Sequence, residues 1–392
     1  MKVTFDREQL ADALGVAVGI IPAKTPKPVL QNVKVVATAA DRVGGACRVD
    51  VSATDLESGV RLAVRGVVVE RSGSCLVPAQ KLLAIVKELT DSRLVIEASA
   101  DAVTVSTLGS EFELPTAPVD EFPDIPDLPA GDGATAYAGH LRQLASRVMF
   151  AAGKENVRYA LGGVLWEMAQ DKLTLVGTDT RRLAIADGVV TGNPGANNVI
   201  IPSRAMNLLA RTLDEGLVRF YFGVSEAMFA VSGIAGQSPD AGDSPASDPA
   251  NVMVTVYTRI MDGRYPPYRQ VLPKDVKTTV TMTAGPLLAG VRQAAILTDD
   301  AVSKGVEFAF VPGILTLTSR IPDRGRSRVG LACDFKGKDV AVTLQPQFVT
   351  EFLKGLSGDQ TVHIHLTNGA SAILMTVGDN YQYVIMPITG KE

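Results

Sequence analysis

The chain has 392 residues, 46% of them hydrophobic, and a net charge of −4, which is enough length for about two or three domains. It begins MKVTFDREQL, with charges where a secretory signal needs an apolar stretch, and no apolar run approaches the ~18 residues of a membrane span. Cys47, Cys75 and Cys333 form no CxxC pair, so neither disulfides nor a zinc site are expected. We expect a cytoplasmic protein without a membrane partner, and the acidic balance argues mildly against nucleic-acid binding.

In chain order, six stretches have the 3.6-residue apolar spacing of helices: 6–19, 79–89, 139–152, 203–213, 284–297 and 347–356. A short β-rich run precedes each stretch, and alternating β-like runs follow it. Pro78, Pro202 and Pro346 stand at three of these strand-to-helix junctions, where a first helical turn tolerates the missing N–H. The pattern predicts a unit of one strand, one helix and three strands that occurs six times.

The six units group into three tandem α+β domains. The segments CLVPAQKLL, VIIPSRAMNLL and VTLQPQFVTEFL align, and Pro-rich stretches separate the repeats at 119–133 and 265–277. We therefore predict domains at 1–127, 128–275 and 276–392. Residues 235–250, AGQSPDAGDSPASDPA, have too little apolar surface to order themselves, and we predict a mobile insertion in the second domain.

Two strand ends share the dipeptide Thr-Asp, in VSATDLESGVRLAV (51–64) and LVGTDTRRLAIA (175–186). Asp55 and Asp179 resemble a catalytic acid pair, but the sequence supplies no nucleophile or metal cluster beside them. A turn at the end of a strand is the simpler interpretation.

The predicted helices are more basic than the rest of the chain. They carry five acidic side chains and nine basic ones. The nine basic residues are Arg7, Lys81, Lys87, Arg142, Arg147, Arg204, Arg211, Arg292 and Lys354. Because each apolar stripe should pack on a sheet, the basic sides should face outward and attract a polyanion. Solvated faces with a chance imbalance of charge are the alternative interpretation.

A series of motifs occurs in one order along the repeat: TPKPVLQNV, ATDLE, VPAQKL, DEFPDIPD, ENVRYALGGVLWE, GTDTRRLA, VIIPSRA, DGRYPPYRQVLPK, AAILTDD and YVIMP. With them the chain resembles the bacterial sliding clamp, the β subunit of DNA polymerase III, over nearly its whole length. The resemblance implies three clamp-type domains per chain and a head-to-tail homodimer that closes into a ring around duplex DNA. It also implies a processivity factor, not an enzyme, with no cofactor or metal.

In this family, polymerases and the clamp loader insert a short peptide into a groove. By resemblance, the groove residues here are Leu161, Thr178, Thr180, Arg182, Leu183, Pro266, Val271, Val384, Ile385, Met386 and Pro387. A buried C-terminal strand is the alternative interpretation of YVIMP. The family usually has Gly at the position of Thr180 and often His at that of Arg181, and some members have Arg at that of Gln270. Thr180 is therefore expected to narrow the mouth of the groove.

Two further sets of residues follow from the resemblance. Lys24, Arg158 and Tyr159 match loops that contact duplex DNA, alongside the helix cations Lys81, Lys87, Arg142, Arg147, Arg204, Arg211, Arg292 and Lys354. Ala160 replaces a second Tyr that is common in the family. Phe112, Ile296 and Leu297 match apolar residues of the dimer interface, with ordinary core packing as the alternative.

Signals for an enzyme are weak. His363 and His365 share one face of a predicted strand without a third ligand nearby, and AAGKE lacks the remaining residues of a phosphate-binding loop. The alternative to a clamp is a cytosolic peptide-binding scaffold or an enzyme that kept this fold but lost ring closure.

Overall fold

The computed structural model describes residues 1–39, 47–129, 133–153, 160–232, 252–298, 305–321 and 325–388. The 235–250 insertion, Arg158 and Tyr159 lie outside these ranges. The chain folds into two compact units. Unit 1 contains Met1–Arg142, Val190–Asn197 and Arg204–Ile260, and unit 2 contains Gln143–Val189, Asn198–Ser203 and Met261–Glu392. Within the described residues, no helix is long and apolar enough to cross a membrane.

All six predicted helices are present, with ends that differ from the prediction by three residues or fewer. They are α1 (Arg7–Val18), α2 (Ala79–Glu88), α3 (Ala138–Met149), α4 (Ser203–Thr212), α5 (Ala284–Ala295) and α6 (Pro346–Lys354). Pro346 opens α6 as predicted, whereas Pro78 and Pro202 are the last residues of the preceding strands. The Asp6 carboxylate caps α1, accepting hydrogen bonds from two backbone N–H groups at 3.1 Å.

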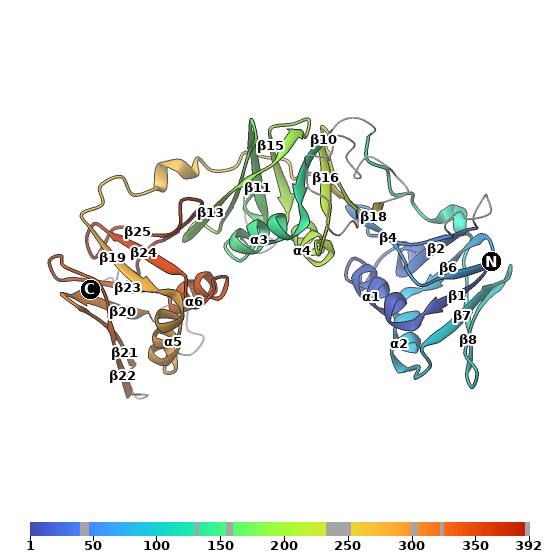
Figure 1. Cartoon of the computed structure of the whole chain (residues 1–392), viewed down its shortest axis with the longest axis horizontal. Helices are drawn as coiled ribbons and strands as arrows, with labels where there is room; N and C mark the ends of the chain where they lie inside the picture. The colour runs from blue at the N-terminus through green and yellow to red at the C-terminus, as the bar shows by residue number, and fades with distance from the viewer. Residues whose placement is uncertain are drawn as a thin grey trace. The chain divides into compact units, whose positions relative to one another are not determined.

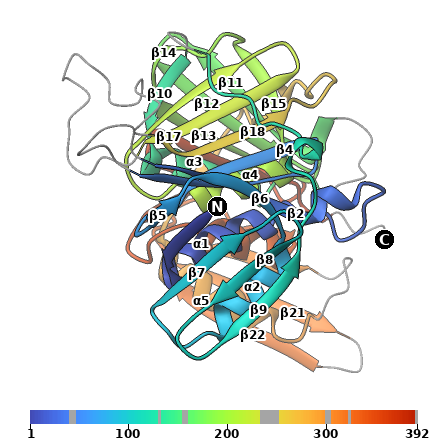
Figure 2. The same ribbon diagram turned by 90° about the vertical axis from the view of Figure 1, so that its right-hand side faces the viewer.

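Unit 1 contains two antiparallel sheets. The five-stranded sheet has the order β5 (Val68–Arg71), β1 (Lys2–Asp6), β7 (Arg93–Ala98), β8 (Ala102–Ser106) and β9 (Glu111–Pro115). The nine-stranded sheet has the order β14 (Thr191–Asn193), β10 (Gly133–Tyr137), β16 (Leu217–Phe222), β17 (Glu226–Ser232), β18 (Val252–Arg259), β4 (Ser58–Ala63), β3 (Arg48–Thr54), β2 (Asn32–Thr38) and β6 (Gly73–Pro78). Figure 2 shows β7, β8 and β9 side by side, with β9 at the edge.

Unit 2 also contains two sheets. The eight-stranded sheet has the order β15 (Asn198–Pro202), β11 (Gly163–Ala169), β12 (Lys172–Thr178), β13 (Arg182–Val189), β26 (Tyr381–Ile385), β25 (Ile373–Val377), β24 (Thr361–Leu366) and β19 (Thr278–Thr283). The four-stranded sheet has the order β22 (Gly325–Ala332), β21 (Ile314–Ile321), β20 (Val306–Val311) and β23 (Val340–Leu344).

Each of the six helices buries the apolar stripe that its spacing predicts. In unit 1, α1 and α2 pack on each other, and α1 contacts strands of both sheets (Figure 1). In unit 2, α5 and α6 pack on each other in the same way, and α5 also covers β21 and β22. The six predicted copies of strand, helix and three strands are therefore confirmed, with β5 and β14 as additional short strands.

In four of the six copies, the last strand pairs with the last strand of another copy, and these pairings lie inside the large sheets. In unit 1, β4 pairs antiparallel with β18, and in unit 2, β13 pairs antiparallel with β26. Each pairing spans five residue pairs, so main-chain hydrogen bonds make both large sheets continuous across the repeats.

The Thr-Asp dipeptide of the first repeat forms a turn, as interpreted from the sequence. The Thr54 hydroxyl donates to the Ser58 carbonyl at 2.8 Å, and the Asp55 carboxylate accepts the N–H groups of Glu57 and Ser58 at 3.0 and 2.7 Å. Leu56, between them, has φ of 77°. The other carboxylate oxygen of Asp55 pairs with Arg204 at 2.7 Å, so this acid holds a turn and a helix residue together.

The two histidines lie on a regular strand, β24, as predicted. The Nδ1 atoms of His363 and His365 lie 3.1 and 3.0 Å from the hydroxyls of Thr281 and Thr279 on the neighbouring strand β19. Within the described residues, no group of three or more His, Cys, Asp or Glu could hold a metal ion.

Candidate peptide-binding site

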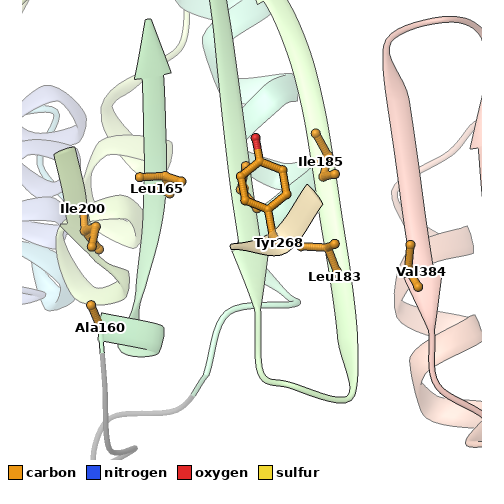
Figure 3. Packing of buried hydrophobic residues seen from close by; sticks show 8 residues of the cluster. Ala160, Leu165, Leu183, Ile185, Ile200, Tyr268 and Val384 are labelled. Atoms are coloured by element: carbon orange, nitrogen blue, oxygen red, sulfur yellow. The ribbon is translucent and has the colours of Figure 1, made fainter. Parts of the chain in front are cut away.

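One face of the eight-stranded sheet carries an apolar cluster, which we call the sheet-face cluster (Figure 3). Six of its residues come from the neighbouring strands β15, β11, β12, β13 and β26, and Ala160 and Tyr268 complete it. The cluster consists of Ala160, Leu165, Val176, Leu183, Ile185, Ile200, Tyr268 and Val384, with Met261, Tyr265, Leu272, Ala372 and Leu374 half-buried against it.

The segment 261–272 lies over this cluster and is attached by two tyrosines. The Tyr265 hydroxyl donates to the Val176 carbonyl of β12 at 3.0 Å, and the Tyr268 hydroxyl donates to the Glu167 carboxylate of β11 at 2.5 Å. Burial raises the pKa of both phenols well above the ordinary value, and the bond to Glu167 raises that of Tyr268 further. Both phenols therefore stay protonated and donate their hydrogen bonds across the physiological pH range.

The sheet register brings several sequence-predicted groove residues together. Leu183 lies opposite Thr178 on one side and opposite Val384 on the other, so the three side chains share the cluster face. Met386 continues this alternation two residues after Val384, and its N–H donates to the Arg181 carbonyl at 2.9 Å. The center of the predicted groove is thus built by three adjacent strands, β12, β13 and β26.

Arg182 and Ile385 lie on the opposite face of this sheet. They are paired directly across β13 and β26, one residue out of phase with Leu183 and Val384. The Arg182 guanidinium lies 4.3 Å from the Phe348 ring and 5.5 Å from the Phe150 ring. Arg182 is therefore packed against α6 and reaches the cluster face only through its backbone, and Ile385 is fully buried on the same face as Arg182.

Arg182 joins three elements of unit 2. Its guanidinium pairs with Asp179 at 2.9 Å and with Glu351 of α6, and it donates to the Phe150 carbonyl beyond α3 at 2.6 Å. Burial opposes its charge, but Tyr383, Glu351 and Asp179 together raise the pKa of this guanidinium above the ordinary value. We assign Arg182 to holding the strand end that carries Thr180.

Thr180 lies at the exposed tip of that strand end. The turn repeats the one at Asp55: the Thr178 hydroxyl donates to the Arg182 carbonyl at 2.6 Å, and Asp179 accepts from the Arg181 and Arg182 N–H groups at 3.0 and 3.1 Å. Thr180 has φ of 78°, a conformation that favours glycine. This geometry explains why glycine suits the position.

The remaining predicted groove residues differ in exposure. Leu161 is buried beside Ala160, and Pro266 and Pro387 are half-buried. Val271 and Met386 are 52% and 47% exposed, which is unusual for large apolar side chains. Among the apolar residues of the predicted groove, these two are the exposed ones.

Tyr265, Tyr268 and Glu167 belong to the site, but the sequence analysis did not select them. The motif DGRYPPYRQV holds both tyrosines beside a rigid Pro-Pro pair, and aromatic side chains in such a segment were the available signal. Glu167 gave no signal, because its bonds to Tyr268 and Arg269 join residues far apart in the sequence.

Most of the predicted DNA-contacting cations are exposed. They are Lys24 in a loop and, on helices, Lys81, Lys87, Arg142, Arg204, Arg211, Arg292 and Lys354. Arg142 pairs with Asp214 at 3.4 Å and Arg204 pairs with Asp55. The Arg142 pair is exposed and therefore weak, so this cation stays accessible to an anion. The Arg204 pair is stronger, because the Asp55 side chain is only 7% exposed and Arg204 also donates to the Ile20 carbonyl at 2.6 Å.

Arg147 does not follow the expected outward basic face. It is 6% exposed, and its guanidinium lies 5.0 Å from the Tyr381 ring, while the Tyr381 hydroxyl donates to the Arg147 carbonyl at 2.8 Å. Burial lowers the pKa of Arg147, which Tyr381 partly offsets. Arg147 therefore packs inside unit 2, and we do not include it among the phosphate-contacting residues.

The residues predicted at the dimer interface are at least partly exposed. Phe112 on β9 is 38% exposed, Ile296 just after α5 is 73% exposed, and Leu297 is half-buried. Ordinary core packing accounts poorly for Ile296, because most of its side chain is in contact with solvent.

Two solved DNA polymerase sliding clamps share the fold of this chain. The sliding clamp from Bacillus subtilis matches with a TM-score of 0.85 at 21% identity, and each chain is covered completely. A sliding clamp from Pseudomonas aeruginosa bound to griselimycin matches with a TM-score of 0.85 at 25% identity, again over both whole chains. Both likenesses show that the chain has the fold of a DNA polymerase sliding clamp.

Sequence comparison gives the family. Models of the N-terminal, central and C-terminal domains of the DNA polymerase III beta subunit match residues 1–126, 137–239 and 269–389. Beta sliding clamps from Chlamydia muridarum and Pseudomonas putida are 26% and 27% identical, each covering 99% of this chain and at least 99% of the relative. The chain belongs to the DNA polymerase III beta subunit family, and it is a processivity factor, not an enzyme.

Proposed function

We propose that two copies of this chain close head to tail into a ring around duplex DNA. Each chain contributes three domains, at residues 1–127, 128–275 and 276–392. The ring slides along the duplex and tethers replicative and repair polymerases to it, after a clamp loader has placed it there. The protein acts in the cytoplasm.

The observation that carries this proposal is the distribution of charge. Although the chain is acidic overall, five of the six α-helices in the described residues, α2 to α6, carry exposed Lys or Arg side chains. Contacts between such cations and phosphates carry no sequence information, so they hold duplex DNA without fixing a position on it. Retention then comes from encirclement, and weak individual contacts allow sliding.

The experiment compares circular with linear DNA. The purified protein should sediment at twice the 41.3 kDa chain mass, and after loading on nicked circles it should leave when the circle is cut. Equal retention on circles and on unblocked linear DNA would contradict encirclement. A monomer at micromolar concentration that still binds peptide would favour the alternative, a scaffold that has lost ring closure.

We also propose that partner peptides bind at the sheet-face cluster, with Val271 and Met386 as the exposed apolar contacts. A short apolar peptide that binds here removes these two side chains from water. Replacement of either residue by Ser loses that apolar contact and should weaken peptide binding by about tenfold. Anisotropy of a labelled partner peptide measures this. Val189→Ser, at a side chain of the same sheet that is 68% exposed, is the matched control and should bind like the unchanged protein.

A further inference from the structure

The exposed apolar residue Val271 ends a short 3₁₀ helix that has little stability of its own. This helix, η6 (Tyr268–Val271), has four residues and follows Pro267, whose side chain makes no capping hydrogen bond. A single 3₁₀ turn has poor hydrogen-bond geometry, and a short helix does not persist in water without tertiary contacts. Contacts with the sheet therefore decide where η6 lies, and with it Val271.

One carboxylate of the sheet, that of Glu167 on β11, holds the first two residues of η6. It accepts the Tyr268 hydroxyl at 2.5 Å and the Nη1 and Nη2 groups of Arg269 at 3.2 and 2.7 Å. The Arg269 guanidinium also lies 4.8 Å from the centre of the Tyr268 ring. Hydrogen bonds to an ionised carboxylate are about twice as strong as neutral ones. Glu167 therefore anchors η6 to the sheet.

The geometry of η6 connects this anchor to Val271. In a 3₁₀ helix the side chains of residues i and i+3 lie above one another, so Tyr268 and Val271 lie on the same side of η6. Tyr268 is 6% exposed within the sheet-face cluster, whereas Val271 is 52% exposed. A bond that fixes the Tyr268 hydroxyl therefore also fixes Val271 at the margin of the cluster.

A second carboxylate of this sheet face is bonded elsewhere. Glu167 lies opposite Thr174, and Thr174 lies opposite Asp187, so these residues form one row across β11, β12 and β13. Each lies two residues from a member of the sheet-face cluster on its own strand, so the row shares the cluster face. Asp187 accepts the Thr174 hydroxyl at 2.6 Å and pairs with Lys172 at 2.9 Å. Asp187 thus joins two strands, whereas Glu167 holds η6.

We propose that Glu167 is a positioning residue for the partner peptide, because its carboxylate holds η6 so that Val271 is in place before the peptide binds. The inference rests on the proposed peptide site and names the residue that prepares it. A contact that is already ordered costs no conformational entropy on binding, whereas an η6 without its anchor is ordered only by the peptide. Loss of Glu167 therefore weakens binding although the Val271 side chain is unchanged.

Substitutions of graded severity test the inference. Glu167→Ala removes the acceptor of both η6 residues, and the dissociation constant of the peptide should rise about tenfold. Glu167→Gln keeps an oxygen that accepts the Tyr268 hydroxyl but loses the charge that pairs with Arg269, so the rise should be about threefold. Anisotropy of the labelled partner peptide measures both, and circular dichroism confirms that each variant is folded.

A double-mutant cycle separates positioning from a general loss of structure. If Glu167 acts through Val271, the variant E167A/V271S should bind no more weakly than V271S alone. Two independent losses of about tenfold would instead multiply to about a hundredfold. Met386 follows β26 and is not held by η6, so in E167A/M386S the two losses should multiply.

The matched control is Asp187→Asn, which alters a carboxylate of the same row and should bind the peptide like the unchanged protein. The positioning role is wrong, while the peptide site stands, if Glu167→Ala binds as tightly as the unchanged protein, if its loss multiplies with that of V271S, or if Asp187→Asn weakens binding equally. If V271S and M386S both bind the peptide normally, the proposed peptide site itself is wrong.

Discussion

Arg182 illustrates how one buried side chain decides the position of several elements. Its guanidinium is enclosed by the rings of Phe348 and Phe150 and pairs with carboxylates on a turn and on α6. A charge in this environment is stable only with all its partners, because removal of one leaves another unpaired away from water.

We predict that Arg182→Ala lowers the free energy of unfolding by about 3 kcal/mol, since it leaves Glu351 and the Phe150 carbonyl without their donor. Urea denaturation measures the loss. Arg269→Ala is the matched control, because Arg269 also pairs with a carboxylate but its side chain is 66% exposed, and it should cost less than about 1 kcal/mol. Equal losses would contradict the role assigned to Arg182.

Thr180 carries backbone strain at the tip of the predicted groove. With φ of 78°, a residue with a Cβ costs energy that glycine does not, so Thr180→Gly should raise the free energy of unfolding by about 0.5–1 kcal/mol. It should also strengthen peptide binding by opening the mouth of the groove. Leu56→Gly, at the equivalent turn, should relieve similar strain without affecting peptide binding, and an effect of both variants on binding would refute the local explanation.

At the scale of elements, two glycines test how tightly helices and strands are packed. A Cβ on Gly177 of β12 would lie 2.2 Å from the Val148 carbonyl of α3, whereas one on Gly15 of α1 would meet no atom within 4 Å. Gly177→Ala should therefore destabilise the protein by about 2–3 kcal/mol. Gly15→Ala should stabilise it by about 0.5–1 kcal/mol through helix propensity. Thermal unfolding distinguishes the two signs, and the same sign for both would count against this packing.

Strand β24 provides a dependence on pH. Burial and the neighbouring His363 lower the pKa of His365 from its ordinary value of 6.5. The unfolded chain then binds this proton more readily, so stability is complete above about pH 6.5 and falls as the pH drops through the lowered pKa. Urea midpoints between pH 7.5 and 5 should decline in the unchanged protein and decline less in His365→Gln. His363→Gln should reduce the decline in part, and an unaltered slope in both would exclude these histidines as the cause.

At the scale of the whole molecule, the basic helices act as a group. Replacing Lys81, Arg211, Arg292 and Lys354 with Glu should reduce loading on nicked circles more than tenfold, because each lost phosphate contact weakens binding and each new carboxylate repels the duplex. The effect should be the same for different DNA sequences. The reversal of two exposed acids in D120K/E121K is the control, and unchanged loading by the Glu variant would remove these helices from the DNA path.

The sequence was sufficient for the local structure and its repetition. Apolar spacing located all six helices to within three residues, and the alternating runs indicated their strands. Thr-Asp was correctly interpreted as a turn at Asp55 and Asp179, since the side chains of Thr, Asp and their neighbours bond within five residues. Such features depend on neighbours along the chain, and therefore the sequence alone reveals them.

The face on which a side chain lies was decided by the tertiary structure. Arg147 and Arg182 were expected at surfaces for partners, but packing against Tyr381 and Phe348 places both guanidinium groups inside unit 2. Tyr268 joined the site through Glu167, 101 residues earlier. Spacing along the chain determines which residues share a face of one helix or strand, but only the pairing of distant strands determines what that face meets.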